Sequence, residues 1–281
     1  MPAEGTITPR CGLVGSPIEH SLSPVLHRAA YDALGLAWAY DAHDVPPSRV
    51  DAFMRGLDAA WRGVSVTMPH KVSVLGWCTE VDVVGRTIGA VNTLVRRADG
   101  GWDGANTDVP GMVAALAAAG VEPGSVQQAT VVGAGATAAA AVYAAAHLKT
   151  QRVVVLARSP EKAGPVRELA TRLRIDLDVL SLSDDLPANQ LLISTIPAAA
   201  QEPMAARLAA STQTVFDVTY HPASTPLLRA AAARGACSVP GFALLLHQAV
   251  LQVELMTGCR EAPIDAMRTA GQAALASRLD G

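Results

Sequence analysis

Lysine is scarce in this sequence, so the place of each lysine is informative. Among the 22 basic residues of the 281-residue chain only Lys71, Lys149 and Lys162 are lysines, and the others are arginines. Arginine keeps its proton at any working pH, whereas a lysine can be tuned by its surroundings to exchange one. Lys71 ends the segment SVTMPHK (65–71), directly after a predicted strand, and ligands gather at strand ends in open α/β sheets. Lys71 is therefore the best candidate for proton transfer, against the alternative of an ordinary surface lysine.

A carboxylate and several short polar side chains accompany this lysine along the chain. Asp108 ends the segment GANTD (104–108), where it can act in acid–base chemistry or cap the helix that follows; taken alone, the cap is the better interpretation. The segments SLSP (21–24) and GAVNT (89–93) carry serine, asparagine and threonine side chains suited to bind a carboxylate and hydroxyl groups. Each of these segments can also be a turn or a helix cap.

A glycine-rich segment, GAGATA (133–138), follows an apolar strand and opens a helix. This is the dinucleotide-binding fingerprint in its Gly-x-Gly-x-x-Ala form. Gly133 permits the tight turn, Gly135 lets backbone amides approach a pyrophosphate at the positive end of the helix dipole, and Ala138 lets the helix pack on the strand. A flexible turn in an alanine-rich chain is the alternative. The candidate cofactor-binding residues are Gly133, Ala134, Gly135, Ala136, Thr137 and Ala138.

The end of the next predicted strand indicates which dinucleotide is bound. NAD sites usually place Asp or Glu about 20 residues after the glycine loop to bind the ribose hydroxyls. Here that strand ends in Arg158 and Ser159, with Lys162 one turn later. Two cations beside a helix N-terminus suit a 2′-phosphate, so the sequence predicts NADP, the alternative being that Arg158 is an exposed charge at a strand end.

The apolar periodicity predicts elements that can position these residues. Before residue 120 it predicts strands at 11–14, 38–43, 63–67 and 90–96, helices at 23–34, 49–60 and 109–119, a loop between 67 and 90, and a turn at Asp103-Gly104. After residue 128 it predicts strands at 129–132, 152–157, 177–180, 191–194, 215–218 and 237–239, and helices at 136–147, 161–173, 203–210 and 226–234. Two final helices are predicted at 241–256 and 263–276.

This order of elements predicts an α/β fold of two parts. Strands that alternate with helices indicate a parallel sheet covered on both faces. The C-terminal helices add no strand, so we expect them to pack back on the first domain or to bridge the two. The predicted domains are 1–108, 109–240 and the returning helices 241–281.

Composition excludes several classes of function. A net charge of −3 and few aromatic residues argue against nucleic acid as a partner. The uncharged stretch 129–146 consists mostly of alanine, glycine and threonine, so a strand, a turn and a helix explain it better than a membrane span. Residues 1–10 lack the apolar core of a secretory signal, which favours the cytoplasm. The four cysteines are widely separated, so neither disulfides nor a metal site are predicted.

Taken together and in this order, these segments resemble the shikimate dehydrogenase family over nearly the whole chain. The resemblance rests on SLSP (21–24), VTMPHK (66–71), GAVNT (89–93), NTD (106–108), the glycine loop, and Gly241 with Gln248. It implies an N-terminal α/β substrate domain plus a Rossmann NADP-binding domain, with the C-terminal helices packing on the substrate domain. It also implies NADPH-dependent, reversible reduction of 3-dehydroshikimate to shikimate in chorismate and aromatic amino-acid biosynthesis.

The resemblance further implies roles for individual residues. Lys71 and Asp108 are the expected catalytic pair. Lys71 either gives a proton to the developing alkoxide or mainly stabilises it electrostatically while the proton moves through water. Thr195 and Gly241 are expected near the nicotinamide. Seven residues are expected to bind the substrate: Ser21, Ser23, Ser65, Thr67, Asn92, Tyr220 and Gln248. Of these, Ser21 and Ser23 are expected to bind its carboxylate. For Tyr220, an aromatic side chain that fills a gap between domains is an equally good interpretation.

Three positions depart from the family pattern and keep alternatives open. Ser65 stands where the family usually has asparagine, Ala157 where asparagine commonly precedes the phosphate-binding arginine, and Ala139 where an arginine is frequent. A shorter Ser65 can still donate to a substrate hydroxyl, directly or through water. The alternatives are a quinate or aminoshikimate dehydrogenase of the same family, Ser23 favouring shikimate, and a nucleotide-sensing relative without turnover. The sequence leaves open whether the protein forms a homodimer.

Overall fold

The computed structural model describes residues 8–278, and within it the chain forms two compact units. Unit 1 comprises the chain up to Thr107 and again from Gln248 onward, and unit 2 comprises Asp108–His247. The second division lies inside one long helix, α9 (Gly241–Thr257). The N-terminal stretch 1–7, part of the segment expected to lack a secretory signal, lies outside the described residues.

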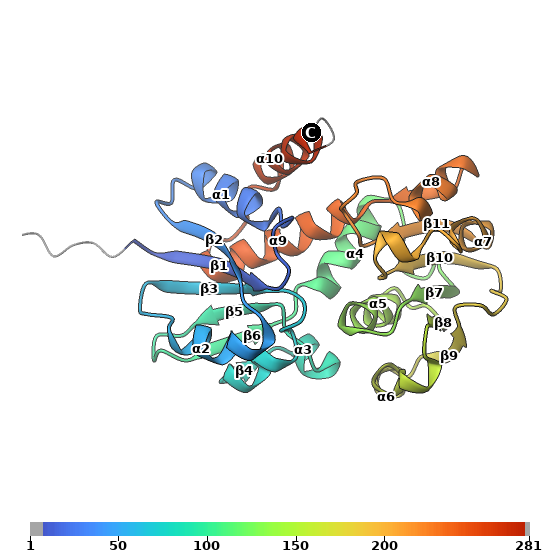
Figure 1. The fold of residues 1–281 in the computed structure, drawn as a ribbon, viewed down its shortest axis with the longest axis horizontal. Coiled ribbons are helices and arrows are strands. Elements are labelled where there is room, and N and C mark those ends of the chain that lie inside the picture. The colour runs from blue at the N-terminus through green and yellow to red at the C-terminus, as the bar shows by residue number, and fades with distance from the viewer. Residues whose placement is uncertain (1–7, 279–281) are drawn as a thin grey trace, which may run out of the picture. The chain divides into compact units, whose positions relative to one another are not determined.

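Unit 1 is built on a mixed six-stranded sheet with the strand order β2-β1-β3-β5-β6-β4 (Figure 1). The three strands β2, β1 and β3 run parallel, β5 is antiparallel to both of its neighbours, and β4 pairs in parallel with β6. Its elements are β1 (Arg10–Gly15), α1 (Ser23–Ala33), β2 (Ala39–Asp44), η1 (Pro47–Arg49), α2 (Val50–Arg55), β3 (Trp61–Val66), η2 (Ser73–Trp77), β4 (Glu80–Val81), α3 (Val83–Ile88), β5 (Thr93–Arg96), β6 (Trp102–Ala105) and α10 (Ile264–Ser277).

The predicted turn at Asp103-Gly104 is wrong, because both residues lie in β6. Asp-Gly is a strong turn signal, but here cross-strand packing outweighs it: Trp102 is buried, and the Arg96 guanidinium lies 4.7 Å from the centroid of its ring. The turn that joins β5 to β6 falls earlier, at residues 97–101, where Gly100 adopts a φ of +90°. The helix predicted for 49–60 is shorter as well and ends at Arg55.

The loop predicted between 67 and 90 contains ordered elements. It forms η2, β4 and the short helix α3, whose N-cap Asp82 accepts a hydrogen bond from the Gly85 amide at 2.6 Å. These elements are too short for apolar periodicity to show them. The Asp82 cap was the available signal.

The C-terminal helices return to unit 1, as the sequence predicts. Helix α10 packs on α1 (Figure 1), and the Arg278 side chain donates to the His20 carbonyl at 2.8 Å. Farther along, α9 lays Met256 over the sheet at Gly63, where a Cβ on the glycine would stand 2.3 Å from Cγ of the methionine. Gly63 is therefore required by the close approach of this helix.

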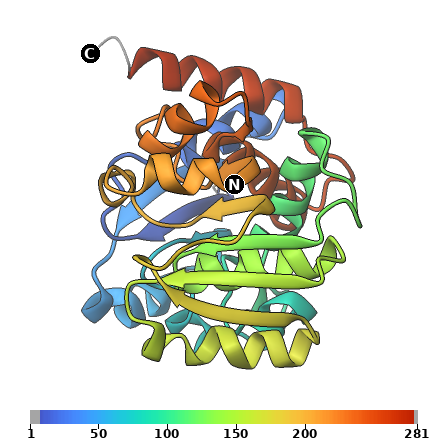
Figure 2. The ribbon, with the colours of Figure 1, turned by 90° about the vertical axis from the view of Figure 1, so that its right-hand side faces the viewer.

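Unit 2 carries a six-stranded sheet, all parallel, with the order β12-β11-β10-β7-β8-β9 (Figure 2). Counted from β7, this is the strand order of a Rossmann fold, so the predicted fold class is confirmed. Its elements are α4 (Asp108–Ala118), β7 (Gln128–Val132), α5 (Ala136–His147), β8 (Arg152–Ala157), η3 (Pro160–Lys162), α6 (Gly164–Leu173), β9 (Asp176–Ser181), β10 (Asn189–Ser194), η4 (Ala198–Ala200), α7 (Ala205–Ala210), β11 (Thr212–Asp217), α8 (Pro226–Ala233), β12 (Cys237–Val239) and the first turns of α9.

The uncharged stretch 129–146 resolves into β7, a turn and α5, as predicted. Most of α5 is alanine and is buried, because small side chains let the helix lie close to the sheet and to α4 and α6. Figure 1 shows α5 and α7 on opposite faces of this sheet. Within residues 8–278 no helix is both long and apolar enough to cross a membrane.

Candidate functional site

The glycine loop of unit 2 has a backbone that only glycine adopts readily. Gly133 has a φ of +116°, and a Cβ there would lie 2.3 Å from the hydroxyl oxygen of Thr195. That hydroxyl donates to the Val132 carbonyl at 2.8 Å, which fixes the start of the loop after β10 against the end of β7. Two of the residues predicted for cofactor binding, Gly133 and Thr195, are thus adjacent.

The N-terminus of α5 is shaped to accept an anion. Its N-cap is Gly135, and no side chain caps the helix, so its first amides have no intrahelical or side-chain acceptor. A Cβ on Gly135 would meet no protein atom within 4 Å. Ala138 is fully buried against the unit core. These features fit the pyrophosphate of a dinucleotide, bound by backbone amides at the positive end of a helix dipole.

The cations predicted to select NADP follow β8. Arg158 and Lys162 are exposed, and neither side chain forms an ion pair or hydrogen bond with any part of the chain between residues 8 and 278. Ser159 is the N-cap of the 3-10 turn η3, which occupies the start of the helix predicted for 161–173, so that helix starts only at Gly164. Pro165 in its first turn has no amide to donate, which suits a helix start. Two exposed, unengaged cations fit a phosphate ligand.

Gly241, one of the two residues expected at the nicotinamide end, lies against the loop that follows β11. Gly241 begins α9, and a Cβ there would lie 2.5 Å from the Val218 carbonyl oxygen and 2.6 Å from that of Thr219. Tyr220 follows Thr219 in the same loop and is partly buried. A glycine is therefore needed where the helix begins beside this loop.

In unit 1 the segment that carries Lys71 is fixed by backbone hydrogen bonds. The Thr67 amide donates to the Val14 carbonyl at 2.9 Å, and the Lys71 carbonyl accepts from the Val91 amide at 2.9 Å. The buried ring of His70 donates from Nε2 to the Val45 carbonyl at 2.6 Å. The Lys71 side chain is partly exposed on this fixed loop.

Asn92 fixes the backbone immediately before Asp108. Its Oδ1 accepts from the Thr107 amide at 2.8 Å and from the Thr93 hydroxyl at 2.9 Å. Asp108 is the first residue of α4 and is only 6% exposed. A carboxylate in the first turn is favoured by the helix dipole, so the alternative of a helix-terminal role for Asp108 remains compatible with this position.

The serines of SLSP lie at the start of α1. The hydroxyl oxygen of Ser21 accepts from the Ser23 amide at 3.2 Å, and the Ser23 carbonyl accepts from Nδ1 of His27 at 2.9 Å. Burial lowers the pKa of His27 to about 4, because the charged imidazolium is disfavoured, although the bond to Ser23 acts the other way. His27 is thus neutral at pH 7.

Ser65 lies in the core. Its hydroxyl accepts from the Tyr40 hydroxyl at 2.7 Å and donates to Oε1 of Gln252 at 2.7 Å. A serine has one proton to donate, and here that proton is used. In this arrangement Ser65 has no donor left for a substrate hydroxyl, contrary to the expectation that it can still donate.

Three buried residues that hydrogen-bond near the site were not predicted from the sequence: Gln252, Tyr40 and His27. Gln252 lies four residues after Gln248 on α9, and both glutamines are buried. Residues i and i+4 lie on one face of a helix. A second glutamine on the face of the first was the signal in the sequence.

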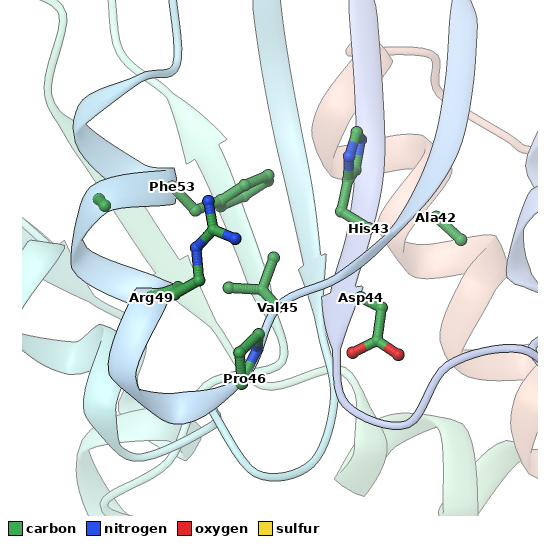
Figure 3. A pocket seen from close by; sticks show the side chains of 8 residues that line it. Ala42, His43, Asp44, Val45, Pro46, Arg49 and Phe53 are labelled. Atoms are coloured by element: carbon green, nitrogen blue, oxygen red, sulfur yellow. The ribbon is translucent and has the colours of Figure 1, made fainter.

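Unit 1 also has an open cavity of about 470 Å³ at the carboxyl end of β2 (Figure 3), lined in part by His43, Asp44, Val45, Pro46, Arg49 and Phe53. None of the residues that line it is a predicted site residue. Figure 3 shows the Arg49 guanidinium and the Phe53 ring turned toward the same space, with Asp44 apart from them. The described residues hold no cluster of histidine, cysteine and acidic side chains that would bind a metal ion.

Two family models match segments of this chain. Residues 13–94 match the model of the shikimate dehydrogenase substrate binding domain, and residues 241–270 that of the shikimate 5′-dehydrogenase C-terminal domain. The chain is 34% identical to the shikimate dehydrogenase (NADP(+)) of Synechococcus sp. (strain JA-3-3Ab), over 94% of each chain.

Solved structures of shikimate dehydrogenases are also similar to this chain. The crystal structure of Mycobacterium tuberculosis shikimate dehydrogenase matches with a TM-score of 0.85 at 38% identity, covering 94% of this chain and 99% of that one. Shikimate 5-dehydrogenase from Thermus thermophilus, in complex with NADP(H) and shikimate, matches with a TM-score of 0.80 at 28% identity, covering 95% and 100%.

Proposed function

Because the chain belongs to the shikimate dehydrogenase family, we propose that it catalyses the reversible, NADPH-dependent reduction of 3-dehydroshikimate to shikimate in chorismate and aromatic amino-acid biosynthesis. The observation that carries the proposal is the conjunction of two sites in one chain. Unit 2 has an uncapped helix N-terminus behind a glycine turn, and unit 1 holds the segments of Thr67, Lys71 and Asn92 in fixed positions.

Unit 2 binds NADP in this proposal. The amides at the start of α5 hold the pyrophosphate, and Arg158 and Lys162 bind the 2′-phosphate by charge-assisted hydrogen bonds. Ala139 is buried, so these two side chains supply the positive charge without an arginine at 139. When bound, NADPH supplies the hydride.

Unit 1 binds the substrate. The hydroxyls of Ser21 and Ser23 bind the carboxylate, and Thr67, Asn92 and Gln248 bind the ring hydroxyls. Tyr220, from unit 2, is proposed to contact the substrate as well.

Lys71 and Asp108 carry the proton chemistry. As the ketone carbon of 3-dehydroshikimate receives the hydride, its oxygen becomes an alkoxide, and the Lys71 ammonium gives that oxygen a proton. Asp108 accepts a hydrogen bond from the hydroxyl and orients it. In the oxidation of shikimate, Lys71 takes the proton back. General acid–base catalysis of this kind is worth about 10²–10⁴ in rate.

The test is hydride transfer in Lys71→Ala and Asp108→Asn, followed by the absorbance of NADPH in single turnovers. We expect each variant to lose about 10²–10⁴ in rate and to keep its affinity for NADPH. Lys149→Gln removes another of the three lysines from an exposed turn and serves as the control with unchanged rate. Near-normal turnover in either test variant would remove that residue from the mechanism.

Ser65 is buried, and its only proton is donated to Gln252, so a second substrate should be tested. Because Ser65 does not offer the donor expected at that position, recognition of one ring hydroxyl rests on other groups. A related cyclic hydroxy acid such as quinate is therefore the second candidate, with Ser23 favouring shikimate. Comparison of kcat/KM for shikimate and quinate, each with NADP and NAD, separates the two.

We also propose that the enzyme works in the cytoplasm and that a homodimer is its candidate assembly. The four cysteines carry no disulfide, which suits a reducing compartment. Light scattering of the purified protein at several concentrations tests the homodimer.

A further inference from the structure

One buried amide joins three separate segments of unit 1. The side chain of Gln252 donates from Nε2 to the Asn92 carbonyl at 3.0 Å and to the Thr93 hydroxyl at 3.1 Å, and its Oε1 accepts from Ser65. Tyr40 extends this hydrogen-bond network, because its hydroxyl donates to that of Ser65. We call these five residues the Gln252 bracket. All five are buried, and every member is uncharged.

The bracket ends on the residue that the proposed function places against the substrate. The Asn92 carbonyl accepts two hydrogen bonds, one from Gln252 and one from the Val66 amide at 2.7 Å. The Asn92 side chain, in turn, accepts from the Thr107 amide. A displacement of the Asn92 backbone would therefore move both its own amide group and the backbone next to Asp108.

The bracket also reaches the segment of the predicted carboxylate-binding serines. The ring of His27 stacks on that of Tyr40, with centroids 4.0 Å apart and planes inclined by 19°. His27 is bonded to the Ser23 carbonyl through Nδ1, so the stacked pair is linked to Ser23 by this hydrogen bond. Tyr40 thereby contacts Ser65 through its hydroxyl and His27 through its ring.

We infer that Gln252 is a positioning residue for substrate recognition: its amide fixes Asn92 directly at the backbone carbonyl and through the Thr93 hydroxyl, and Ser65 supports this amide instead of contacting the substrate. The inference rests on the proposed function. Position 65 carries a serine, whose side chain has no amide group. The only side-chain amide that bonds the Asn92 carbonyl among the contacts of the bracket therefore comes from α9, through Gln252.

The hydrogen bonding of the bracket is specific enough to hold one geometry. Gln252 uses both of its N–H groups and its carbonyl oxygen, so a rotation of the amide by 180° would set its carbonyl oxygen against the Asn92 carbonyl oxygen. A buried network whose members are all satisfied holds its members rigidly, whereas loss of one member leaves orphaned donors and acceptors. An apolar side chain of the same length would fill the space but would remove one of the two hydrogen bonds that the Asn92 carbonyl accepts.

The test uses Gln252→Met, which keeps the length of the side chain and removes the amide. We expect KM for 3-dehydroshikimate to rise at least about tenfold, because misplacement of a binding group by a fraction of an ångström is costly. KM for NADPH should stay within about twofold. Ser65→Ala should shift the same constant in the same direction by a smaller factor.

The matched control is Gln201→Met, which removes the buried bridging glutamine of unit 2. It should lower thermal stability at least as much as Gln252→Met while KM for 3-dehydroshikimate stays within about twofold. Equal changes of that KM in both variants would show that loss of stability is the cause and would overturn the inference.

Rescue tests the exchange of amides directly. In Ser65→Asn/Gln252→Ala an amide is placed at position 65 and the space on α9 is vacated, so KM for 3-dehydroshikimate should recover at least threefold relative to Gln252→Ala alone. No recovery, together with an unchanged KM in Gln252→Met, would overturn the inference. If the wild-type chain itself shows no turnover of 3-dehydroshikimate and no shikimate binding by calorimetry, the proposed function fails instead.

Discussion

Each unit of this molecule contains a buried glutamine that joins a strand end to neighbouring loops, and the two differ in charge. In unit 1, Gln252 bonds only to uncharged partners. In unit 2, Gln201 donates to the Asp217 carboxylate at 2.8 Å and to the Ile196 carbonyl at 3.2 Å, next to Thr195. The Asp217 carboxylate also accepts from the Thr225 hydroxyl at 2.5 Å and from the Thr219 amide at 3.1 Å.

This difference decides how each network responds to pH. Burial raises the pKa of Asp217, because the charged form is desolvated, although the hydrogen bonds from Thr225, Thr219 and Gln201 act in the opposite direction. The Gln252 bracket has no group that titrates near neutral pH, but its neighbour His27 has a lowered pKa. Acid therefore favours the folded form at Asp217 and opposes it at His27.

The largest expected effect is a difference in stability between the two variants that replace these glutamines by methionine. Gln201→Met leaves a buried carboxylate short of a donor and should cost about 3 kcal/mol of stability, because the cost is greater for a charged group than for a neutral one. Gln252→Met leaves only neutral groups without a hydrogen-bond partner and should lower the free energy of unfolding by about 1–3 kcal/mol. Urea unfolding, with hydrogen exchange followed separately in β11 and β5, measures both costs. Equal costs would break the comparison, because charge would then have no energetic consequence here.

A second effect should appear on acidification in unit 1. An unfolded histidine titrates at about 6.5 and folded His27 at about 4, so stability present above pH 6.5 is lost as the pH falls toward 4. The full shift corresponds to on the order of 3 kcal/mol. His27→Asn keeps a donor for the Ser23 carbonyl and should remove this loss in pH-dependent exchange of α1. A retained acid slope in the variant would assign the loss to another group.

The smallest effect should have the opposite sign in unit 2. Because the folded pKa of Asp217 is raised, its contribution to stability declines as the pH rises above 3.8 toward the folded value and remains lower at neutral pH. Asp217→Asn should abolish that slope. The variant should also lose about 1–3 kcal/mol, because an amide group cannot accept from all three donors. Hydrogen exchange of β11 across this pH range measures the slope, and an unchanged slope would contradict the assignment.

Sequence reasoning recovered those features of the fold that repeat locally. The glycine loop, the alternation of strands and helices in unit 2 and the returning C-terminal helices follow from short patterns, and the structure confirms them. The β6 strand was missed because Asp103-Gly104 favours a turn in isolation, whereas its pairing with β5 and the packing of Trp102 decide the outcome. Such packing is not visible in a window of a few residues.

Residues of the candidate site could be predicted from the sequence only where the local structure requires one particular residue type. Gly133 and Gly241 are explained by close approaches that a Cβ would block. Gln252 was missed because its partner Asn92 lies 160 residues away in the sequence and the surrounding helix reads as apolar. The full use of the Ser65 hydroxyl could not be predicted either, since it depends on Tyr40 and Gln252 together.

The contact between Gly63 and Met256 has a consequence for how sequences of this kind can diverge. The missing side chain on β3 and the long thioether on α9 share one volume, so neither position is free to change alone. A homologous sequence with alanine at position 63 should have a shorter residue at position 256. The two positions should therefore covary among homologues, although 193 residues separate them along the chain.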